Sequence, residues 1–324
     1  MPSLASTEQK FPSQSIKSVL VTGGAGFIGS HTVDLLLEHG LRVIVYDNLM
    51  TGKVTHLNLF HPQLEFIPED VLNYSTLLKQ VKRVDAVLHL AALASVQQSI
   101  EDPLGSLRIN TQGFLHVLQA IHEAKRPVRL VFASSAAVYG NCTHLPCHEE
   151  FFDVQPMSPY ALEKANNERY ARLYEHLFHI PSLGLRYFNV YGPRQDPASP
   201  YSGVIAKLIA QHQKGEAVTL FGDGKQCRDF IYVGDVARAN LLALQNDCTG
   251  ILNIATGIPE TLCNLVHYIE QTGGQSTGVN FAAERPGDIR ESYASIEKAE
   301  KSLSFRYNTK LSDGIRLLMN ESKK

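Results

Sequence analysis

The sequence predicts an α/β fold: a doubly wound parallel sheet, followed by a smaller C-terminal segment that closes over its crevice. Three observations support this. Short apolar runs alternate with helical segments from residue 19 to about residue 188. A glycine-rich turn follows the first apolar run, and an acidic residue ends the second. The runs are rich in β-branched residues and lack polar alternation, which is typical of strands buried on both faces of a parallel sheet.

The first strand, turn and helix lie in VLVTGGAGFIG, residues 19–29. Apolar residues continue at helical spacing to Leu37, and Gly40 stands where a helix would end. Gly23, Gly26 and Gly29 let the chain turn tightly and let backbone N–H groups approach a pyrophosphate. The spacing is G-x-x-G-x-x-G rather than the commoner G-x-G-x-x-G, so a glycine-rich turn in another kind of α/β protein is the alternative.

A second strand is expected at Val43–Tyr46, with Asp47 at its carboxyl end. The acid lies about 20 residues beyond the glycines, where it can accept hydrogen bonds from both ribose hydroxyls of an adenosine. Its charge repels a 2′-phosphate. The pattern therefore favours NAD over NADP as the cofactor.

The later elements continue the alternation. Ala91 and Ala92 follow one expected strand and leave room for a ligand at its carboxyl end, whereas His89 within that strand is interpreted as a core histidine. The expected strands are Leu64–Ile67, Ala86–Leu90, Val128–Ala133 and Ser182–Phe188, and the expected helices are Ser75–Val81, Ser106–Ala124 and Ser158–Phe178, the last with Ser158 as N-cap.

The pattern changes after residue 190, where a turn-rich loop precedes shorter elements. Helices are expected at Val204–Gln213 and Val236–Leu244, and strands at Val218–Phe221 and Phe230–Val233. We divide the chain into a flexible leader (1–15), a dinucleotide-binding domain (16–189) and a mainly substrate-binding domain (190–324) whose boundary is interleaved.

Composition narrows the class of partner. The 324 residues are 44% hydrophobic and 19% charged with a net charge of −2, which gives no electrostatic reason to expect nucleic acid or an anionic membrane. The five scattered cysteines without a C-x-x-C pair predict reduced thiols, a cytoplasmic protein and no metal site. Residues 1–15 lack the features of a signal peptide, and no apolar window is long enough to span a membrane.

Three polar side chains are candidates for catalysis. Ser135 follows the strand Val128–Ala133, and Tyr160 and Lys164 are four residues apart on one face of the next helix. A tyrosine has an unperturbed pKa of about 10, so it needs nearby positive charge to act as a base near neutral pH. Lys164 and a positive nicotinamide ring are both expected to lower that pKa. The trio suits hydride transfer from a secondary alcohol to NAD, although a surface Tyr–Lys pair is the alternative for this spacing alone.

Several segments carry a family resemblance. GGAGFIG resembles the extended short-chain dehydrogenase/reductase superfamily. FASSAAVYG (132–140), SPYALEK (158–164), LRYFNVYGPRQDP (185–197), GDGKQCRDFIYVGDVARA (222–239) and RPGDIRES (285–292) resemble its UDP-sugar 4-epimerases, in family order. The resemblance implies a Rossmann domain, bound NAD and a UDP-sugar substrate that is inverted at C4 through a transient 4-keto sugar.

The resemblance also assigns residues. In the catalytic group, Ser135 and Tyr160 would assist proton transfer while Lys164 would bind the nicotinamide ribose. Cofactor contacts would come from Gly23, Gly26, Phe27, Ile28, Gly29, Asp47, Asn48, Asp70, Val71, Leu90, Ala91, Ala92, Asn110, Tyr160, Lys164 and Tyr187. The resemblance also places Asn110 against the catalytic helix, with an ordinary surface or helix-packing amide as the alternative. Substrate contacts would come from Ser95, Ser135, Tyr160, Asn189, Val204, Phe221, Arg228, Arg285, Asp288 and Ser292, with the two arginines clamping the diphosphate and Asp288 contacting the uridine ribose.

The sequence lacks the acidic residues that two related reactions need. Sugar-nucleotide 4,6-dehydratases carry an Asp-Glu pair after the position of Ser135, and decarboxylases of UDP-glucuronate carry a Glu at the second of these places; here Ala136 and Ala137 stand there. The alternatives that stay open are a UDP-uronate 4-epimerase, another nucleotide-sugar oxidoreductase and a non-enzymatic NAD-binding protein.

The resemblance also bears on the sugar and on assembly. A large tyrosine at the position of Ser292 is typical of the members of this family that are restricted to glucose and galactose. The small side chain of Ser292 resembles the members that also take N-acetylated sugars, which implies UDP-GlcNAc and UDP-GalNAc as substrates, with UDP-Glc and UDP-Gal as a second pair. The helices Ser106–Ala124 and Ser158–Phe178 carry apolar residues beyond one stripe. In this family such helices pair across a two-fold axis, which implies a homodimer.

Overall fold

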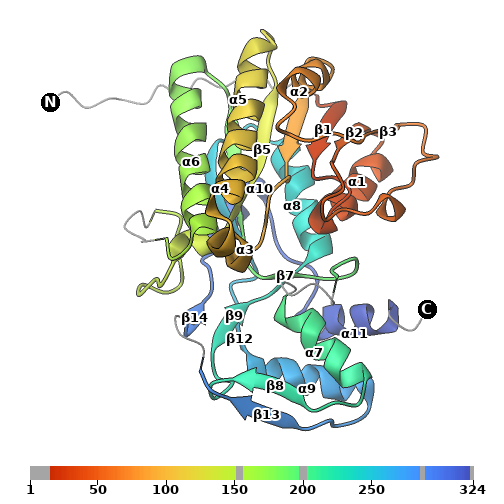
Figure 1. Ribbon diagram of the computed structural model, residues 1–324, viewed down its shortest axis with the longest axis vertical. Coiled ribbons are helices and arrows are strands. Elements are labelled where there is room, and N and C mark those ends of the chain that lie inside the picture. The colour runs from red at the N-terminus through yellow and green to blue at the C-terminus, as the bar shows by residue number, and fades with distance from the viewer. Residues whose placement is uncertain (1–14, 151–155, 197–202, 285–288, 322–324) are drawn as a thin grey trace, which may run out of the picture.

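The computed structural model describes residues 15–150, 156–196, 203–284 and 289–321, arranged as a large α/β body and a smaller lobe beneath it (Figure 1). The large body contains a seven-stranded sheet of order β11-β6-β5-β4-β1-β2-β3. Every neighbouring pair is parallel, and the order reverses between β1 and β4. The strands are β1 (Ser18–Thr22), β2 (Arg42–Tyr46), β3 (Leu64–Ile67), β4 (Ala86–His89), β5 (Arg129–Ser135), β6 (Ser182–Tyr187) and β11 (Gly250–Ile254). The doubly wound sheet that the sequence predicts is confirmed.

Helices cover both faces of this sheet because successive strand residues point to opposite sides. On one face Val19 and Val21 pack with α1 (Phe27–Glu38), α8 (Val233–Gln245) and α10 (Glu297–Leu303). On the other face Leu20 and Ile44 pack in a second apolar cluster. Its helices are α2 (Tyr74–Val81), α5 (Gly113–Glu123) and α6 (Pro159–Phe178).

The expected long helix at 106–124 begins earlier and is interrupted. Asp102 caps α4 (Pro103–Leu107), with Pro103 at the first helical position. A π-helical segment, Arg108–Gln112, then joins it to α5. The six-residue α3 (Val96–Glu101) has no counterpart among the predicted helices because it is too short to show a period.

The smaller lobe has its own apolar cluster, which includes Ile205, Leu265 and Ile315. These residues lie on α7 (Val204–Gln213), α9 (Leu262–Gly273) and α11 (Leu311–Glu321). The accompanying short strands are β7 (Val190–Tyr191), β8 (Val218–Phe221), β9 (Cys227–Asp229), β10 (Ile231–Tyr232), β12 (Pro259–Thr261), β13 (Val279–Ala282) and β14 (Glu291–Ser292). Elsewhere, the described residues form 3-10 turns at Val54–His56 and Ala136–Tyr139.

The chain after residue 190 contributes to both bodies. The strand predicted at Phe230–Val233 is shorter because Val233 begins α8, which packs on α1 in the large body. Strand β11 then joins the edge of the large sheet beside β6. Among the described residues, no helix is long and apolar enough to cross a bilayer.

Candidate active site

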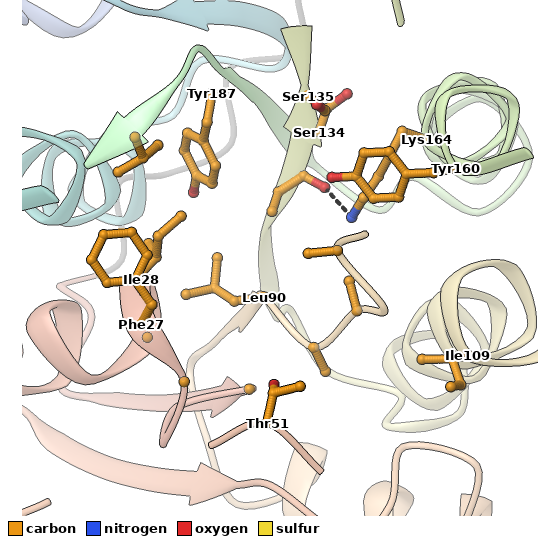
Figure 2. A pocket seen from close by; sticks show the side chains of 18 of the residues that line it. Phe27, Ile28, Thr51, Leu90, Ile109, Ser134, Ser135, Tyr160, Lys164 and Tyr187 are labelled. Carbon is orange, nitrogen blue, oxygen red and sulfur yellow. Dashed lines mark hydrogen bonds between the residues drawn. The ribbon is translucent and has the colours of Figure 1, made fainter. Parts of the chain in front are cut away.

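A cavity of about 560 Å³ lies at the carboxyl ends of the central strands, where the strand order reverses (Figure 2). Open α/β sheets bind ligands at this point because loops from adjacent strands diverge there. The cofactor residues expected from the sequence line it, with the exception of Asn110. They are Gly23, Gly26, Phe27, Ile28, Gly29, Asp47, Asn48, Asp70, Val71, Leu90, Ala91, Ala92, Tyr160, Lys164 and Tyr187.

The glycine turn forms a cradle that side chains would fill. Gly23 has φ of +71°, and a Cβ there would lie 2.6 Å from the backbone nitrogen of Ala91. A Cβ at Gly29 would lie 2.1 Å from the carbonyl oxygen of Gly23. Helix α1 begins after Gly26 without a side-chain cap and without an acid in its first turn. Its first N–H groups and the positive end of its dipole therefore suit the pyrophosphate of a dinucleotide.

Asp47 lies beside this cradle and has a second role that the sequence did not suggest. Its Oδ2 accepts a hydrogen bond from the backbone nitrogen of Ala25 at 3.0 Å, and its Oδ1 accepts one from Leu49 at 2.8 Å. The carboxylate therefore holds the glycine turn in place. Asn48 donates to Asp70 at 2.7 Å, so a second acid stands at the same edge. This concentration of negative charge fits NAD better than NADP.

Ser135, Tyr160 and Lys164 face the cavity from β5 and α6 (Figure 2). Ser135 is the last residue of β5, whereas the sequence predicts that the strand ends at Ala133, before Ser135. Ser158 caps α6 as expected, and the helix then places Tyr160 and Lys164 one turn apart. The Nζ of Lys164 donates to the carbonyl of Ala133 at 3.0 Å and lies 5.7 Å from the centre of the Tyr160 ring.

The electrostatics of Tyr160 differ from the sequence argument. Burial is the largest effect and raises the pKa of Tyr160, while a hydrogen bond with Ser135 lowers it and Glu163 raises it. Burial also lowers the pKa of Lys164 to about 8, against the opposing effects of Glu163 and Glu168. In the protein alone, burial outweighs the hydrogen bond with Ser135, because removing a phenolate from water is costly. The lowering expected from Lys164 together with a bound nicotinamide ring stays a prediction.

Asn110 lies against the catalytic helix, as the resemblance implies, and does not line the cavity. Its Nδ2 donates to Glu163 on α6 at 2.7 Å, and its Oδ1 accepts from the backbone nitrogen of Leu93 at 2.8 Å. The Oε2 of Glu163 also accepts from Ser106 at 2.7 Å. The π-helical segment carries Asn110 into this buried position, so its amide is fully occupied by protein.

Ser95 is another residue whose place differs from its expected role. Its hydroxyl accepts from the backbone nitrogen of Gln98 at 3.0 Å and caps α3, and Ser95 is not among the residues that line the cavity. Its neighbours Ala94 and Val96 do line it. The serine therefore contributes to the cavity indirectly, because its cap fixes the start of α3, where Ala94 and Val96 line the wall.

A buried ion pair behind the site was not predicted. Glu168 accepts from Nε of Arg186 at 2.8 Å and from its Nη2 at 2.6 Å, and it also accepts from Ser134 at 2.5 Å. The Arg186 guanidinium lies 4.7 Å from the ring centre of Tyr139. The network fixes the end of β5 next to Ser135. Glu168 stands four residues after Lys164 on α6, which is the one signal in the sequence that could have indicated it.

The expected substrate residues extend toward the smaller lobe. Asn189 and Arg228 line both the main cavity and a neighbouring cavity of about 630 Å³, which Val204 and Phe221 also line. Ser292 on β14 lies in register with Arg228 on β9 and lines the main cavity. Arg285 and Asp288 lie outside the described residues.

The glycine cradle, the acid at the second strand and the Ser-Tyr-Lys group on one cavity define an enzyme with a Rossmann domain that binds NAD. A family model described as the NAD dependent epimerase/dehydratase family matches residues 19–255. The chain belongs to this family, and it is an NAD-dependent isomerase.

Solved structures of relatives agree over almost the whole chain. A UDP-N-acetylglucosamine 4-epimerase of Methanobrevibacter ruminantium, solved with UDP-N-acetylmuramic acid, is 39% identical with a TM-score of 0.91, covering 95% of this chain and 99% of its own. A UDP-glucose 4-epimerase of Thermus thermophilus, solved with NAD, is 38% identical with a TM-score of 0.86, covering 94% and 99%. A UDP-glucuronic acid 4-epimerase of Bacillus cereus is 32% identical with a TM-score of 0.84, covering 94% and 99%.

Proposed function

We propose that this enzyme interconverts UDP-GlcNAc and UDP-GalNAc and acts on UDP-Glc and UDP-Gal as a second pair. The broader activity, NAD-dependent 4-epimerisation of UDP-sugars, is the activity of its relatives and of this enzyme. The observation that carries the choice of sugar is the small side chain of Ser292 in the cavity wall.

Ser292 shares the cavity with the catalytic group and is a strand neighbour of Arg228. It lines the same cavity as Ser135 and Tyr160, and β14 places it beside Arg228, whose guanidinium suits a diphosphate. A tyrosine at this position would fill space that an N-acetyl group must enter. A serine leaves that space open, which supports acetylated sugars without excluding plain ones.

In the proposed reaction, Tyr160 takes the proton from the sugar O4 hydroxyl, and Ser135 holds the same oxygen by a hydrogen bond. NAD, when bound, supplies the reversible acceptor for the C4 hydride. Lys164 supplies positive charge beside the phenol. Asn189 and Arg228 hold the diphosphate while the 4-keto sugar turns about its phosphate linkage, and Tyr160 then returns the proton to the inverted product.

The wall next to Ser135 argues against elimination and decarboxylation. Ala136 and Ala137 begin the 3-10 turn after β5, and both line the cavity. Neither can donate or accept a proton, so the positions that carry acids in dehydratases and decarboxylases are apolar here. A 4-keto sugar formed beside them lacks a protein group that would expel water or carbon dioxide.

The substitution Ser292→Tyr tests the proposal. We expect kcat/KM for the acetylated pair to fall by about a hundredfold or more relative to the plain pair, because each ~1.4 kcal/mol of steric cost is a factor of ten. Ser292→Ala is the control and should keep both activities. Equal losses on both pairs in Ser292→Tyr would show that this residue does not select the sugar.

Three alternatives are separated by assays of turnover and of cofactor consumption. A UDP-glucuronic acid 4-epimerase of Bacillus cereus is similar to this chain, so UDP-glucuronate is also assayed. A higher kcat/KM for UDP-glucuronate than for the acetylated pair would replace the proposal. A reductase would consume reduced cofactor in proportion to product, whereas an epimerase shows no net change in cofactor. Absence of turnover on all three substrate types would point to an NAD-binding protein without this chemistry.

A further inference from the structure

A second cavity, of about 480 Å³, lies at the opposite end of β5 from the active site. Arg129, the first residue of β5, lines it, whereas Ser135, the last, lines the active site. The two ends are about 20 Å apart along the strand. Buried apolar side chains form the floor of this amino-edge cavity: Ile121, Val128, Ile180 and Leu244. Its size is that of a small-molecule site.

Arg129 is the unusual group in this cavity, because it is only 9% exposed and its guanidinium is incompletely bonded. Its Nη2 donates to the carbonyls of Ala243 at 3.2 Å and Cys248 at 2.5 Å. Its Nε and Nη1 are buried and have no hydrogen-bond partner among the described residues. Unpaired donors on a buried cation are costly. Both atoms are shielded from solvent, so an anion in the cavity would satisfy them when the Arg129 side chain turns toward it.

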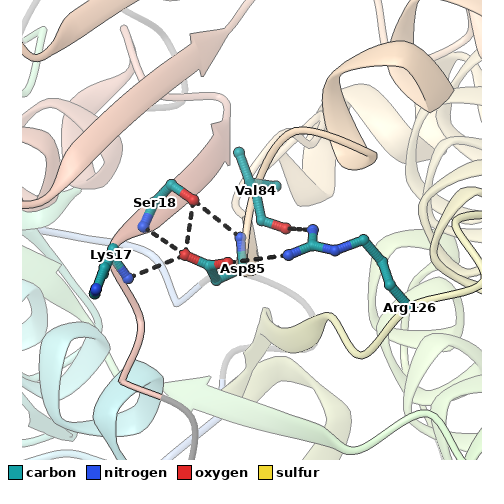
Figure 3. A network of polar contacts seen from close by, with 5 residues as sticks. All are labelled: Lys17, Ser18, Val84, Asp85 and Arg126. Atoms are coloured by element: carbon teal, nitrogen blue, oxygen red, sulfur yellow. Dashed lines mark hydrogen bonds and ion pairs between the residues drawn. The ribbon is translucent and has the colours of Figure 1, made fainter.

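The neighbouring acid is already saturated, as Figure 3 shows. Asp85 accepts hydrogen bonds from the backbone of Lys17 at 3.1 Å and from the backbone of Ser18 at 3.0 Å. It also accepts from the Ser18 hydroxyl at 2.8 Å and from Arg126 at 3.0 Å, while Arg126 donates in addition to the carbonyl of Val84. Arg126 and Asp85 therefore neutralise each other at the rim, and no carboxylate of the described residues is hydrogen-bonded to Arg129.

The remaining charges give the cavity one surplus positive charge. The residues that line the cavity include Lys125, Arg126 and Arg129 against Asp85 and Asp247, and Asp247 together with Glu175, which does not line it, acts on the charge of Arg129 from a distance. One wall is aromatic, since the rings of His122 and Phe178 are 4.3 Å apart and both residues line the cavity. The lining therefore combines an apolar floor, an aromatic wall and one buried cation.

We propose that the amino-edge cavity binds an amphipathic organic monoanion. Its apolar or aromatic body lies on the floor between Ile121 and Leu244 and against Phe178, and its single acidic group accepts hydrogen bonds from Arg129. A neutral ligand leaves the buried donors unpaired, and a ligand with several negative charges finds only one surplus positive charge in the lining.

The probe for this site is 8-anilinonaphthalene-1-sulfonate, an aromatic monoanion whose fluorescence rises in apolar surroundings. It is titrated into the full-length enzyme in saturating NAD and UDP, which block the active site. We expect one saturable site. Its neutral counterpart, N-phenyl-1-naphthylamine, should bind about tenfold or more weakly, because it cannot pair with the guanidinium. Equal affinity for both probes would overturn the proposal.

Two variants locate the probe. Arg129→Met should weaken its binding by about tenfold or more, whereas Arg42→Met, the same change at the first residue of β2 on the same sheet edge, should leave it unchanged. If Arg129→Met does not fold, Lys125→Glu on the exposed rim replaces it and should weaken binding severalfold. Binding that is insensitive to Arg129→Met, or to Lys125→Glu, would place the probe elsewhere and refute the site.

Discussion

Thr22 and His89 share a hydrogen bond of 2.8 Å between Oγ1 and Nδ1, at the carboxyl ends of the adjacent strands β1 and β4. His89 is 2% exposed, and its ring centre lies 5.6 Å from that of Phe114. It is the core histidine that the sequence predicts. Burial first, and the charge of Lys164 second, lower the pKa of His89 to about 3.

This lowered pKa predicts a loss of stability in acid. The unfolded chain binds a proton at His89 below pH 6.5, whereas the folded protein does not until about pH 3. The free energy of unfolding is therefore unaffected by His89 above pH 6.5. Between pH 6.5 and about pH 3 it falls by about 1.4 kcal/mol for each unit that the pH is lowered. Urea unfolding between pH 4.5 and 7 should show a shallower pH dependence in His89→Gln than in the native protein. The exposed His39→Gln is the control, and equal slopes in all three proteins would contradict the assignment.

Alanine substitutions at two glycines should distinguish the effect of backbone strain from the effect of steric crowding in the glycine turn. Gly23 and Gly40 have φ of +71° and +75°, but only a Cβ at Gly23 meets other atoms. Gly23→Ala should lose bound NAD and lower the melting temperature, since its methyl group would overlap the backbone at Ala91. Gly40→Ala should show only the strain, about 1 kcal/mol, and keep its NAD. NAD content is measured on purified protein by absorbance and chromatography, and equal NAD retention in the two variants would refute the role of the turn.

Tyr160→Phe should reduce kcat by about a thousandfold or more without changing the fold, because it removes the proposed proton-transfer group. Epimerisation is followed by product chromatography, and folding by circular dichroism. Tyr170→Phe, on the same helix α6, is the matched control and should remain active. Near-native turnover in Tyr160→Phe would mean that another group carries the proton.

The homodimer expected from the sequence stays a prediction, and exposed apolar side chains support it. They lie on α3, α4 and α6, which pack against one another: Val96, Ile100, Leu104, Leu107, Leu162, Leu173 and Leu177. Light scattering should give about twice the chain mass of 35.9 kDa, and Leu104→Glu should shift it toward one chain. Leu317→Glu, an exposed leucine of α11, is the control. A native protein at the single-chain mass would contradict the dimer.

Much of the fold could be predicted because its signals are local. The strand–turn–helix of residues 18–38 follows from an apolar run, spaced glycines and a 3.6-residue period, all of which lie within one short window. The catalytic helix is similar, since Ser158 and Pro159 mark its start. Of the elements that were missed, α3 is too short to show a period, whereas β11 is a strand because its backbone pairs with β6, more than 60 residues earlier.

The same division holds within the site. By itself, the sequence determined the doubly wound sheet, the glycine cradle with Asp47, and the presence of Ser135, Tyr160 and Lys164, because spacing along the chain fixes each of these. Tertiary structure alone decided that Glu163 is the partner of Asn110 on the catalytic helix, that Glu168 pairs with Arg186, and that burial raises the pKa of Tyr160. Burial and hydrogen-bond pairing are set by residues that are distant in sequence, and the free energy of removing a charged group from water depends on all of them together.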